Sequence, residues 1–388
     1  MRKTKRTLFI LLLLMNMTIL PGCWNYKEIS DKAVATGVAI DYDKSTDEVI
    51  MSVEVAVPVQ KGEKMAIEPQ VLEGRGHNFF DAARNSVTKT GRRVFWSHAK
   101  VIILGRSVAD NHDKFVGVLD WFRRDAETRD DILMLYSMEK TAEEILTDIK
   151  IETESITSFY LEDMLKNEGA TSKYAAVKLW EFTDQLQTEG ISATIPTVRL
   201  GHYKDKVTGE IFGTAVFRGW QQVGWLDGTE TMYYLMAADK MKGGILVIEA
   251  KKGKDVERIS LEVFNNKAKI KPIYEDGELR MKIDVKTVVN IAEIDSQKDF
   301  IEEKNRETLK KIAEQQIKQR IEAVIHKTQK EYGTDIYGFG NKVEIEMPEL
   351  WKEIKADWPE IYSKVKTDVH VEIKIQGSAL RSKPIEVK

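Results

Sequence analysis

A single cysteine, Cys23, is the residue of this chain with the clearest capacity for chemistry. It ends an apolar stretch that runs from Leu8 to Leu20 and continues through Pro21 and Gly22. A thiolate is the natural nucleophile for accepting a diacylglyceryl group, and Gly22 leaves room at the Gly22–Cys23 bond for a peptidase. One thiol cannot form an internal disulfide. We therefore expect this sulfur to be a point of attachment for lipid.

The segment before Cys23 has the charged start and short apolar centre of a secretory signal. Its basic residues are Arg2, Lys3, Lys5 and Arg6, and its apolar run is too short to span a bilayer comfortably. Leu20-Pro21-Gly22-Cys23 resembles a bacterial lipobox, because an apolar residue stands three positions and a small residue one position before the cysteine. We predict a signal peptide over residues 1–22, cleavage at Gly22–Cys23, and S-diacylglyceryl and N-acyl groups on Cys23.

Two acyl chains on one residue are enough for stable anchoring in a membrane. The competing interpretation is an ordinary buried cysteine that follows a plain secretory signal or an uncleaved anchor. We favour the lipobox, because the lone cysteine stands at the one position where that motif requires it.

The composition is that of a globular protein with a highly charged surface. Of 388 residues, 42% are hydrophobic and 31% charged, and the formal net charge is −3. Removing the basic leader makes the chain more acidic, which argues against a nucleic-acid binder and against an electrostatic membrane patch. After residue 23, no apolar stretch approaches the roughly 18 residues of a membrane helix. We expect two or three domains outside the membrane.

Motifs for catalysis, cofactors and metals are absent from the sequence. None of the six histidines stands at metal-ligand spacing with another, and GxSxG, P-loop and GxGxxG patterns are missing. We predict a protein that is not an enzyme and has no metal or cofactor. His98 could form a polar site at the mouth of a strand, but a hydrogen-bonded structural role is favoured. Gly338-Phe339-Gly340 is predicted to be a flexible turn rather than a phosphate cradle.

One aromatic pair could bind a partner. Trp220 and Trp225 flank a short turn-like segment that could project both indoles, and tryptophan is enriched at interface hot spots. Packing within the core of a hairpin is the alternative that we favour.

Hydrophobic periodicity predicts an α+β fold of mostly antiparallel or mixed sheets with packed helices. In the N-terminal half the pattern predicts strands at 37–40, 49–57, 99–104 and 132–138, and helices at 78–89, around 116–122, and at 141–149, 155–165 and 174–188. Asn78 and Gly91 have the residue types that cap a helix. Pro58 is expected to end strand pairing, with a loop over 60–69, and Pro196 to mark 191–200 as an edge strand.

The C-terminal half is predicted to contain strands at 211–218, 223–226, 244–250, 257–271, 279–294 and 367–376, a helix at 229–241 and one long helix near 296–332. Ser296 and Asp299 could cap the long helix, and its apolar stripe could pack on the domain's own sheet or form a coiled coil. We favour the sheet. The polar segment Gly201 to Thr208 separates a region at 23–200, with room for two subdomains, from a C-terminal α+β domain at 206–388.

Several ordered blocks resemble the Ger(x)C family, the lipoprotein subunits of spore nutrient-germinant receptors. They are Gly22-Cys23-Trp24 with Glu28-Ile29, Gly37 to Asp41, Thr90 to Arg93, Ser97 to Gly105, Gly213 to Phe217, Gly224 to Leu226, and Trp358 with Asp368-Val369, Val371 and Gly377. Each block is modest, but their order and spacing span nearly the whole chain.

The resemblance implies a protein anchored on the outer, extracytoplasmic face of the spore inner membrane of a Gram-positive spore former. It implies assembly with two integral-membrane partners, a larger A-type subunit and a permease-like B-type subunit that recognises the nutrient. The family is not known for enzymes, and its folds are uncommon multi-domain α+β arrangements. Whether this chain itself binds a germinant stays open.

Two other functions compete with this one. A substrate-binding lipoprotein that feeds a nutrient transporter usually has two doubly wound lobes with a ligand cleft, whereas the C-terminal half here shows runs of adjacent strands. A cell-envelope hydrolase would need a convergent cluster of acid, base or nucleophile in a pocket.

Overall fold

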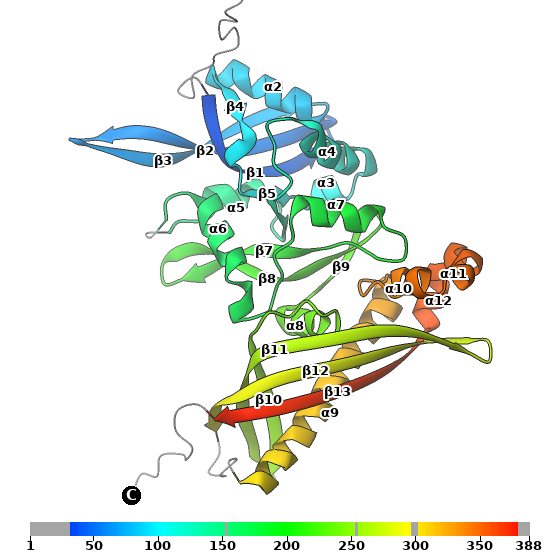
Figure 1. The fold of residues 1–388 in the computed structure, drawn as a ribbon. Helices are drawn as coiled ribbons and strands as arrows, with labels where there is room; N and C mark the ends of the chain where they lie inside the picture. The colour runs from blue at the N-terminus through cyan, green and yellow to red at the C-terminus, as the bar shows by residue number, and fades with distance from the viewer. Residues whose placement is uncertain (1–31, 152–153, 253–254, 296–301, 379–388) are drawn as a thin grey trace, which may run out of the picture.

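Two sheets lie one above the other along the molecule in the computed structural model, which describes residues 32–151, 154–252, 255–295 and 302–378 (Figure 1). The larger sheet has nine strands and the smaller one four. Helix α8 (Gly228–Ala237) lies between them and is buried along almost its whole length. This arrangement confirms the predicted α+β fold.

The larger sheet is parallel at its centre and antiparallel at both ends. Its strands are β1 (Lys32–Asp43), β2 (Glu48–Lys61), β3 (Lys64–Gly76), β4 (Arg93–Phe95), β5 (Val101–Leu104), β6 (Leu133–Ser137), β7 (Thr194–Tyr203), β8 (Lys206–Arg218) and β9 (Gln221–Leu226). The order is β3-β2-β1-β5-β6-β7-β8-β9, and β4 pairs with β1. The β1–β5, β5–β6 and β6–β7 pairs are parallel.

Helices cover both faces of the larger sheet, because its central strands are apolar on both sides. In β5, Ile102 and Leu104 belong to one core and Val101 and Ile103 to the other. Helices α2 (Phe79–Thr90), α4 (His112–Arg124) and α7 (Leu179–Gln187) pack on the first face. Helices α5 (Glu143–Asp148) and α6 (Thr157–Lys166) pack on the second, and the short α3 (Arg106–Ala109) contacts β1.

Helix α2 confirms the predicted caps. The Asn78 side chain accepts a hydrogen bond from the Asp81 amide at 2.9 Å, and Gly91 ends the helix with φ of 66°. That left-handed conformation costs glycine little.

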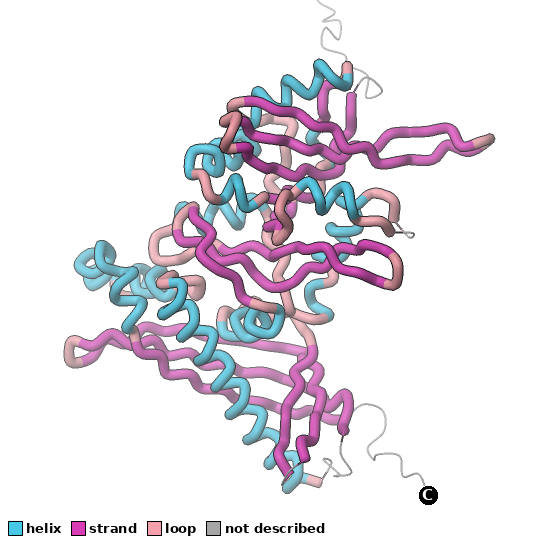
Figure 2. Tube along the Cα trace, turned by 180° about the vertical axis from the view of Figure 1, so that it is seen from behind, coloured by secondary structure: helices cyan, strands magenta, loops and turns pink. Residues whose placement is uncertain are grey.

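The smaller sheet curls around the long helix predicted from the sequence. Its strands are β10 (Ile245–Lys252), β11 (Asp255–Glu275), β12 (Glu278–Asp295) and β13 (Lys366–Ser378), and only the β12–β13 pair is parallel. Helix α9 (Glu303–Lys327) runs along one face of this sheet, as Figure 2 shows, and buries Leu309, Ala313 and Ile317. The stripe therefore packs on the chain's own sheet, as predicted.

The end of the long helix also agrees with the prediction. A π-helical turn, η4 (Thr328–Tyr332), continues α9, and Gly333 stops it with φ of 57°. Ser296 and Asp299, the predicted caps, lie outside the described residues.

Three short helices after this point were not predicted. They are α10 (Phe339–Glu346), α11 (Pro348–Ile354) and α12 (Trp358–Lys364), with the 3-10 turn η5 (Lys355–Asp357) between the last two. The predicted flexible turn at Gly338-Phe339-Gly340 is instead a helix start, with Phe339 and Gly340 buried. Short helices give weak periodic signals, because two turns contain few positions of an apolar stripe.

The predicted loop over 60–69 is wrong. Strands β2 and β3 form a hairpin that pairs residue by residue from Val49–Gly76 to Lys61–Lys64 and projects beyond the rest of the sheet (Figures 1 and 2). Pro58 does not end the pairing, because it lies beyond Ala56, the last residue of β2 that pairs with β1. A proline is tolerated where no neighbouring strand needs its missing N–H.

The predicted edge position of Pro196 is also wrong, because β7 lies between β6 and β8. The β6–β7 pairing involves only Thr197 and Val198, so it spares Pro196, and a bulge in the β7–β8 pairing follows it. Residues 204 and 205 form the turn of the β7–β8 hairpin. The chain passes from the larger to the smaller sheet later, between Leu226 and Ile245.

Candidate functional site

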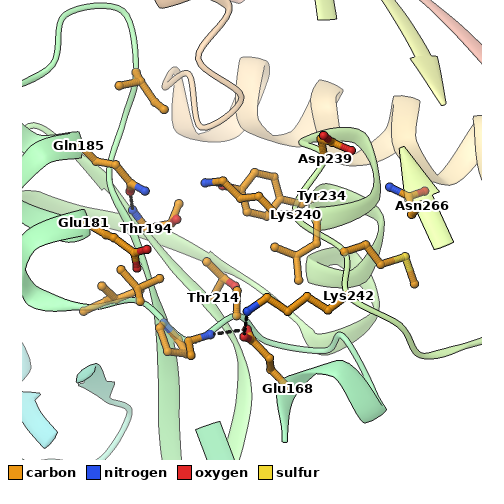
Figure 3. A pocket seen from close by; sticks show the side chains of 18 of the residues that line it. Glu168, Glu181, Gln185, Thr194, Thr214, Tyr234, Asp239, Lys240, Lys242 and Asn266 are labelled. Atoms are coloured by element: carbon orange, nitrogen blue, oxygen red, sulfur yellow. Dashed lines mark hydrogen bonds and ion pairs between the residues drawn. The ribbon is translucent and has the colours of Figure 1, made fainter. Parts of the chain in front are cut away.

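A polar cleft lies between the two sheets beside helix α8. It contains a cavity of about 730 Å³ between α7 and the end of α8 (Figure 3). A neighbouring cavity of about 570 Å³ shares Glu168, Ala176, Glu181 and Lys242 with the first. The cleft is one place where side chains from the N-terminal and C-terminal halves of the chain meet.

Glu168 is the buried acid of this cleft. It begins the 3-10 turn η3 (Glu168–Ala170) that follows α6, and its side chain is 11% exposed. Its carboxylate accepts a hydrogen bond from the Ala176 amide at 2.7 Å and forms an ion pair with Lys242, the dashed contacts of Figure 3. Lys242 follows α8, so this pair connects the two halves.

The backbone after Lys242 passes unusually close to the same turn. The Ser172 hydroxyl donates to the Gly243 carbonyl at 2.7 Å. A Cβ on Gly243 would lie 2.5 Å from the Gly169 carbonyl oxygen, and Gly244 has φ of 114°. The two glycines therefore allow a contact that a side chain would prevent.

Other polar groups of the cleft also have protein partners. Gln185 accepts from the Thr194 amide at 3.0 Å, and Asp239 accepts from the Ala268 amide at 2.8 Å. The Asn266 side chain donates to the Met236 carbonyl and accepts from Thr287. These groups hold segments of the chain together, which is the arrangement expected of a structural junction.

A second junction centres on Asp335. Its carbonyl accepts from the Ser192 amide at 2.7 Å, which ties the C-terminal half to the loop before β7. Its carboxylate accepts from the Tyr337 and Gly340 amides and from the Trp358 indole. Burial raises the pKa of Asp335 to about 7, because desolvation outweighs these hydrogen bonds.

The described residues show no metal-binding group, since no three histidine, cysteine, aspartate or glutamate side chains are placed together for one. His98 is exposed at the end of the 3-10 turn η2 (Trp96–His98), lies 5.9 Å from the Phe95 ring and lines the second cavity. The hydrogen-bonded structural role that the sequence favoured stays a prediction.

The two tryptophans considered from the sequence have different surroundings. Trp220 packs against the core of the larger sheet and contacts the His112 ring edge-on at 5.4 Å. Trp225 is 49% exposed on β9. The packing expected of the pair therefore holds for Trp220 alone.

The predicted lipidation site lies outside the described residues. Leu20, Pro21, Gly22 and Cys23, with the leader at 1–22, all precede Lys32, where the described chain begins. In the residues that the structure describes, no helix is both long and apolar enough to cross a membrane.

Two sequence-family models cover most of the chain. "Spore germination protein N-terminal domain" matches residues 25–200, and "Spore germination B3/ GerAC like, C-terminal" matches residues 212–379. The chain belongs to the Ger(x)C family. The first Ger(x)C match ends at residue 200, before the β7–β8 turn, and the second begins at residue 212, after it.

Relatives from Bacillus subtilis (strain 168) match over nearly their whole length. Spore germination protein KC is 24% identical, with 98% of each chain covered, and spore germination protein B3 is 25% identical, with 91% of this chain and 93% of that protein covered. The crystal structure of the GerBC protein aligns with a TM-score of 0.57 at 21% identity, covering 88% of this chain and 97% of that one. This likeness shows a shared Ger(x)C fold.

The residues that join the two halves were missed from the sequence. Glu168 and Asp335 stand in stretches without a motif. Lys242-Gly243-Gly244 was interpreted only as the connection after the helix predicted at 229–241. The adjacent glycines were the one available signal, because a glycine pair outside a turn can mark close backbone contact.

Proposed function

We propose that this chain is the lipoprotein subunit of a spore nutrient-germinant receptor. It is cleaved at Gly22–Cys23, acylated on Cys23 and held at the outer face of the spore inner membrane. There it assembles with the A-type and B-type integral-membrane subunits and acts by that assembly to trigger germination.

The observation that carries the proposal is the Ger(x)C match over both halves of the chain. The names of the relatives, all spore germination proteins, support it. The cleft adds physical support for a role without catalysis, because its polar groups connect segments of the protein instead of converging on an open reaction centre.

A Cys23→Ala variant tests the anchoring. Loss of the thiol removes the acceptor of the diacylglyceryl group, so we expect the protein to leave the washed membrane fraction and the spores to germinate poorly in nutrient. Pro21→Ala is the matched control, because it leaves the apolar and small positions of the lipobox intact and should behave as the natural protein does. A normal nutrient response from spores with fully released Cys23→Ala protein would refute the proposal.

Assembly is tested by copurification of the acylated protein with its two membrane subunits. We expect all three in one detergent-solubilised complex. Recovery of this chain alone would contradict the receptor assignment.

The substrate-binding alternative makes a different prediction for the cleft. A transporter-associated binding protein would take up its nutrient tightly between the two sheets. Calorimetry of the full chain with amino acids and sugars measures this directly, and strong heat from one of them would favour that function.

A further inference from the structure

A groove of about 900 Å³ lies at the end of the larger sheet where the described chain begins. Strands β1, β2 and β3 and the end of α2 enclose it. Ala33, Val55, Val57 and Leu72 line it on one face of the sheet, and its charged residues are Lys32, Glu73, Lys89 and Arg92. The groove therefore combines an apolar floor with three basic side chains and one acidic one.

The start of the chain places this groove close to the proposed anchor. Eight residues separate Cys23 from Lys32, and an extended segment of that length reaches at most about 30 Å. Lys32 itself lines the groove. A lipid surface that holds the acyl chains of Cys23 therefore lies within about 30 Å of the groove.

The β2–β3 hairpin extends from the same end of the sheet as the groove. Strand β2 is antiparallel to β1, so its far end lies at the end of the sheet where β1 begins. Five residue pairs of β2 and β3 extend past Ala56, where pairing with β1 stops. At the tip, Met65 is 69% and Ile67 58% exposed. Apolar side chains thus continue from the groove toward the same surface.

The charges of the groove favour an anionic ligand. Lys89 is 59% exposed and pairs with Glu73 at 3.1 Å, in a contact weak enough to be exchanged for a phosphate. Arg92 is exposed beside it, and guanidinium groups bind phosphate oxygens through two parallel hydrogen bonds. Lys32, the third basic residue, is paired with Glu127 at 3.6 Å, so the positive charge available to a ligand comes from Lys89 and Arg92.

We propose that this groove binds an anionic phospholipid of the membrane in which Cys23 is anchored. An acyl chain lies on the floor of Val55, Val57 and Leu72, and the headgroup phosphate is held by Lys89 and Arg92. The inference rests on the proposed lipid anchor, and it adds a second contact that fixes how the body is oriented on the bilayer.

Native mass spectrometry of the full acylated chain, released gently from detergent, tests the proposal with phosphatidylglycerol and phosphatidylcholine as probes. We expect one phosphatidylglycerol to be retained in preference to phosphatidylcholine. Arg92→Glu and Lys89→Glu should each weaken retention on the order of tenfold, because each reverses one charge beside the phosphate. Lys352→Glu, an exposed lysine of α11 far along the chain, is the control and should retain lipid normally.

A third variant tests the apolar floor without changing charge. Val57→Trp should fill the groove and exclude the acyl chain, and circular dichroism of the same sample verifies that the chain is folded. Equal retention of the two lipids, or full retention by Arg92→Glu, would overturn the proposal.

The same spectra separate this inference from the function on which it rests. The mass of the chain itself reports whether Cys23 carries its acyl groups. Acylated protein without bound phosphatidylglycerol would refute the groove and leave the anchor standing. Protein without acyl groups would refute the anchor and, with it, the geometric basis of the groove.

Discussion

Glu314 and Gln316, two residues apart on helix α9, bind opposite edges of the smaller sheet. Glu314 accepts a hydrogen bond from the Ile373 amide of β13 at 2.9 Å. Gln316 accepts from the Glu249 amide of β10 at 3.1 Å and donates to the carbonyl of the same residue. Because free strand edges invite pairing with other chains, one helix both fills the concave face of this sheet and blocks part of each edge.

Removing either edge contact should cost a measurable amount of stability. We expect Glu314→Ala and Gln316→Ala each to lower the free energy of unfolding by about 1 kcal/mol, the usual net value of such hydrogen bonds. Gln315→Ala is the matched control, because Gln315 is exposed between them. Urea denaturation measures all three variants. A loss of stability in Gln315→Ala as large as in the other two would contradict the role of the edge contacts.

Glu54 should be among the acids that contribute most to stability. It is fully buried in β2, and its carboxylate accepts from the Thr157 and Ser158 amides at the start of α6, both at 2.8 Å. Glu54→Ala leaves two buried N–H groups without an acceptor, so we expect a loss of about 3 kcal/mol or more. Glu54→Gln keeps one oxygen and should cost less.

Thermal and urea unfolding measure both Glu54 variants. Glu63→Ala, an exposed acid at the hairpin tip, is the control and should change stability by less than about 0.5 kcal/mol. Equal stability of Glu54→Ala and Glu63→Ala would show that the hydrogen bonds of Glu54 to the start of α6 do not stabilise the protein.

Asp335 should make the folded protein sensitive to pH below neutrality. Its folded pKa of about 7 exceeds the ordinary 3.8, so between these values the folded chain keeps a proton that the unfolded chain has released. The resulting stability is fully present below pH 3.8 and is lost as the pH rises through 7. At 1.36 kcal/mol per pKa unit, the loss reaches roughly 4 kcal/mol.

An Asp335→Asn variant should flatten this part of the stability profile, because an amide does not ionise. Urea denaturation from pH 4 to pH 8 follows the slope, with Asp205→Asn in the exposed β7–β8 turn as the control. An unchanged slope in Asp335→Asn would assign the pH dependence to other groups.

The glycines of the cleft allow a paired test. Gly243→Ala would place a Cβ 2.5 Å from the Gly169 carbonyl oxygen, whereas Gly169→Ala would place one 3.6 Å from Lys242, an ordinary contact. We expect a cost of about 1 to 3 kcal/mol for the first and less than about 0.5 kcal/mol for the second. Small-angle scattering would detect any change in how the two halves are arranged.

The Glu168–Lys242 pair should respond unequally to removal of its members. The Glu168 side chain is 11% exposed and that of Lys242 67%. Lys242→Ala should cost less than about 1 kcal/mol, as exposed charges do. Glu168→Ala also leaves the Ala176 amide without its acceptor, so we expect about 2 kcal/mol. Equal effects in urea denaturation would contradict this ranking.

Local signals predicted much of the fold. Asn78 and Gly91 identified the ends of α2, because capping depends on a few neighbouring residues. The stripe through Leu309, Ala313 and Ile317 predicted α9 and its burial, because a long helix repeats its pattern many times. The short helices around Trp351 and Trp358 bury only one or two side chains each and offered no such repetition.

The errors arose where distant neighbours decide the outcome. Pro58 and Pro196 are compatible with their strands because the hydrogen-bonded pairing with β1 and with β6 does not include them, which no local pattern reveals. The same limit applies to the groove of Lys89 and Arg92, since a nearly neutral total charge conceals where the fold gathers basic residues. Glu168 and Lys242 stand 74 positions apart, and only the fold brings them together.

The β7–β8 hairpin has a consequence for how such proteins are inherited. Most of β7 lies in the first family-matched region and the second half of β8 in the second, yet both strands belong to one sheet. A gene cut between them would encode an N-terminal product in which β7 is an open strand edge. The C-terminal product would carry β8 and β9 without the rest of the larger sheet. We therefore expect recombination to exchange the two regions together, because neither region should fold stably without the other.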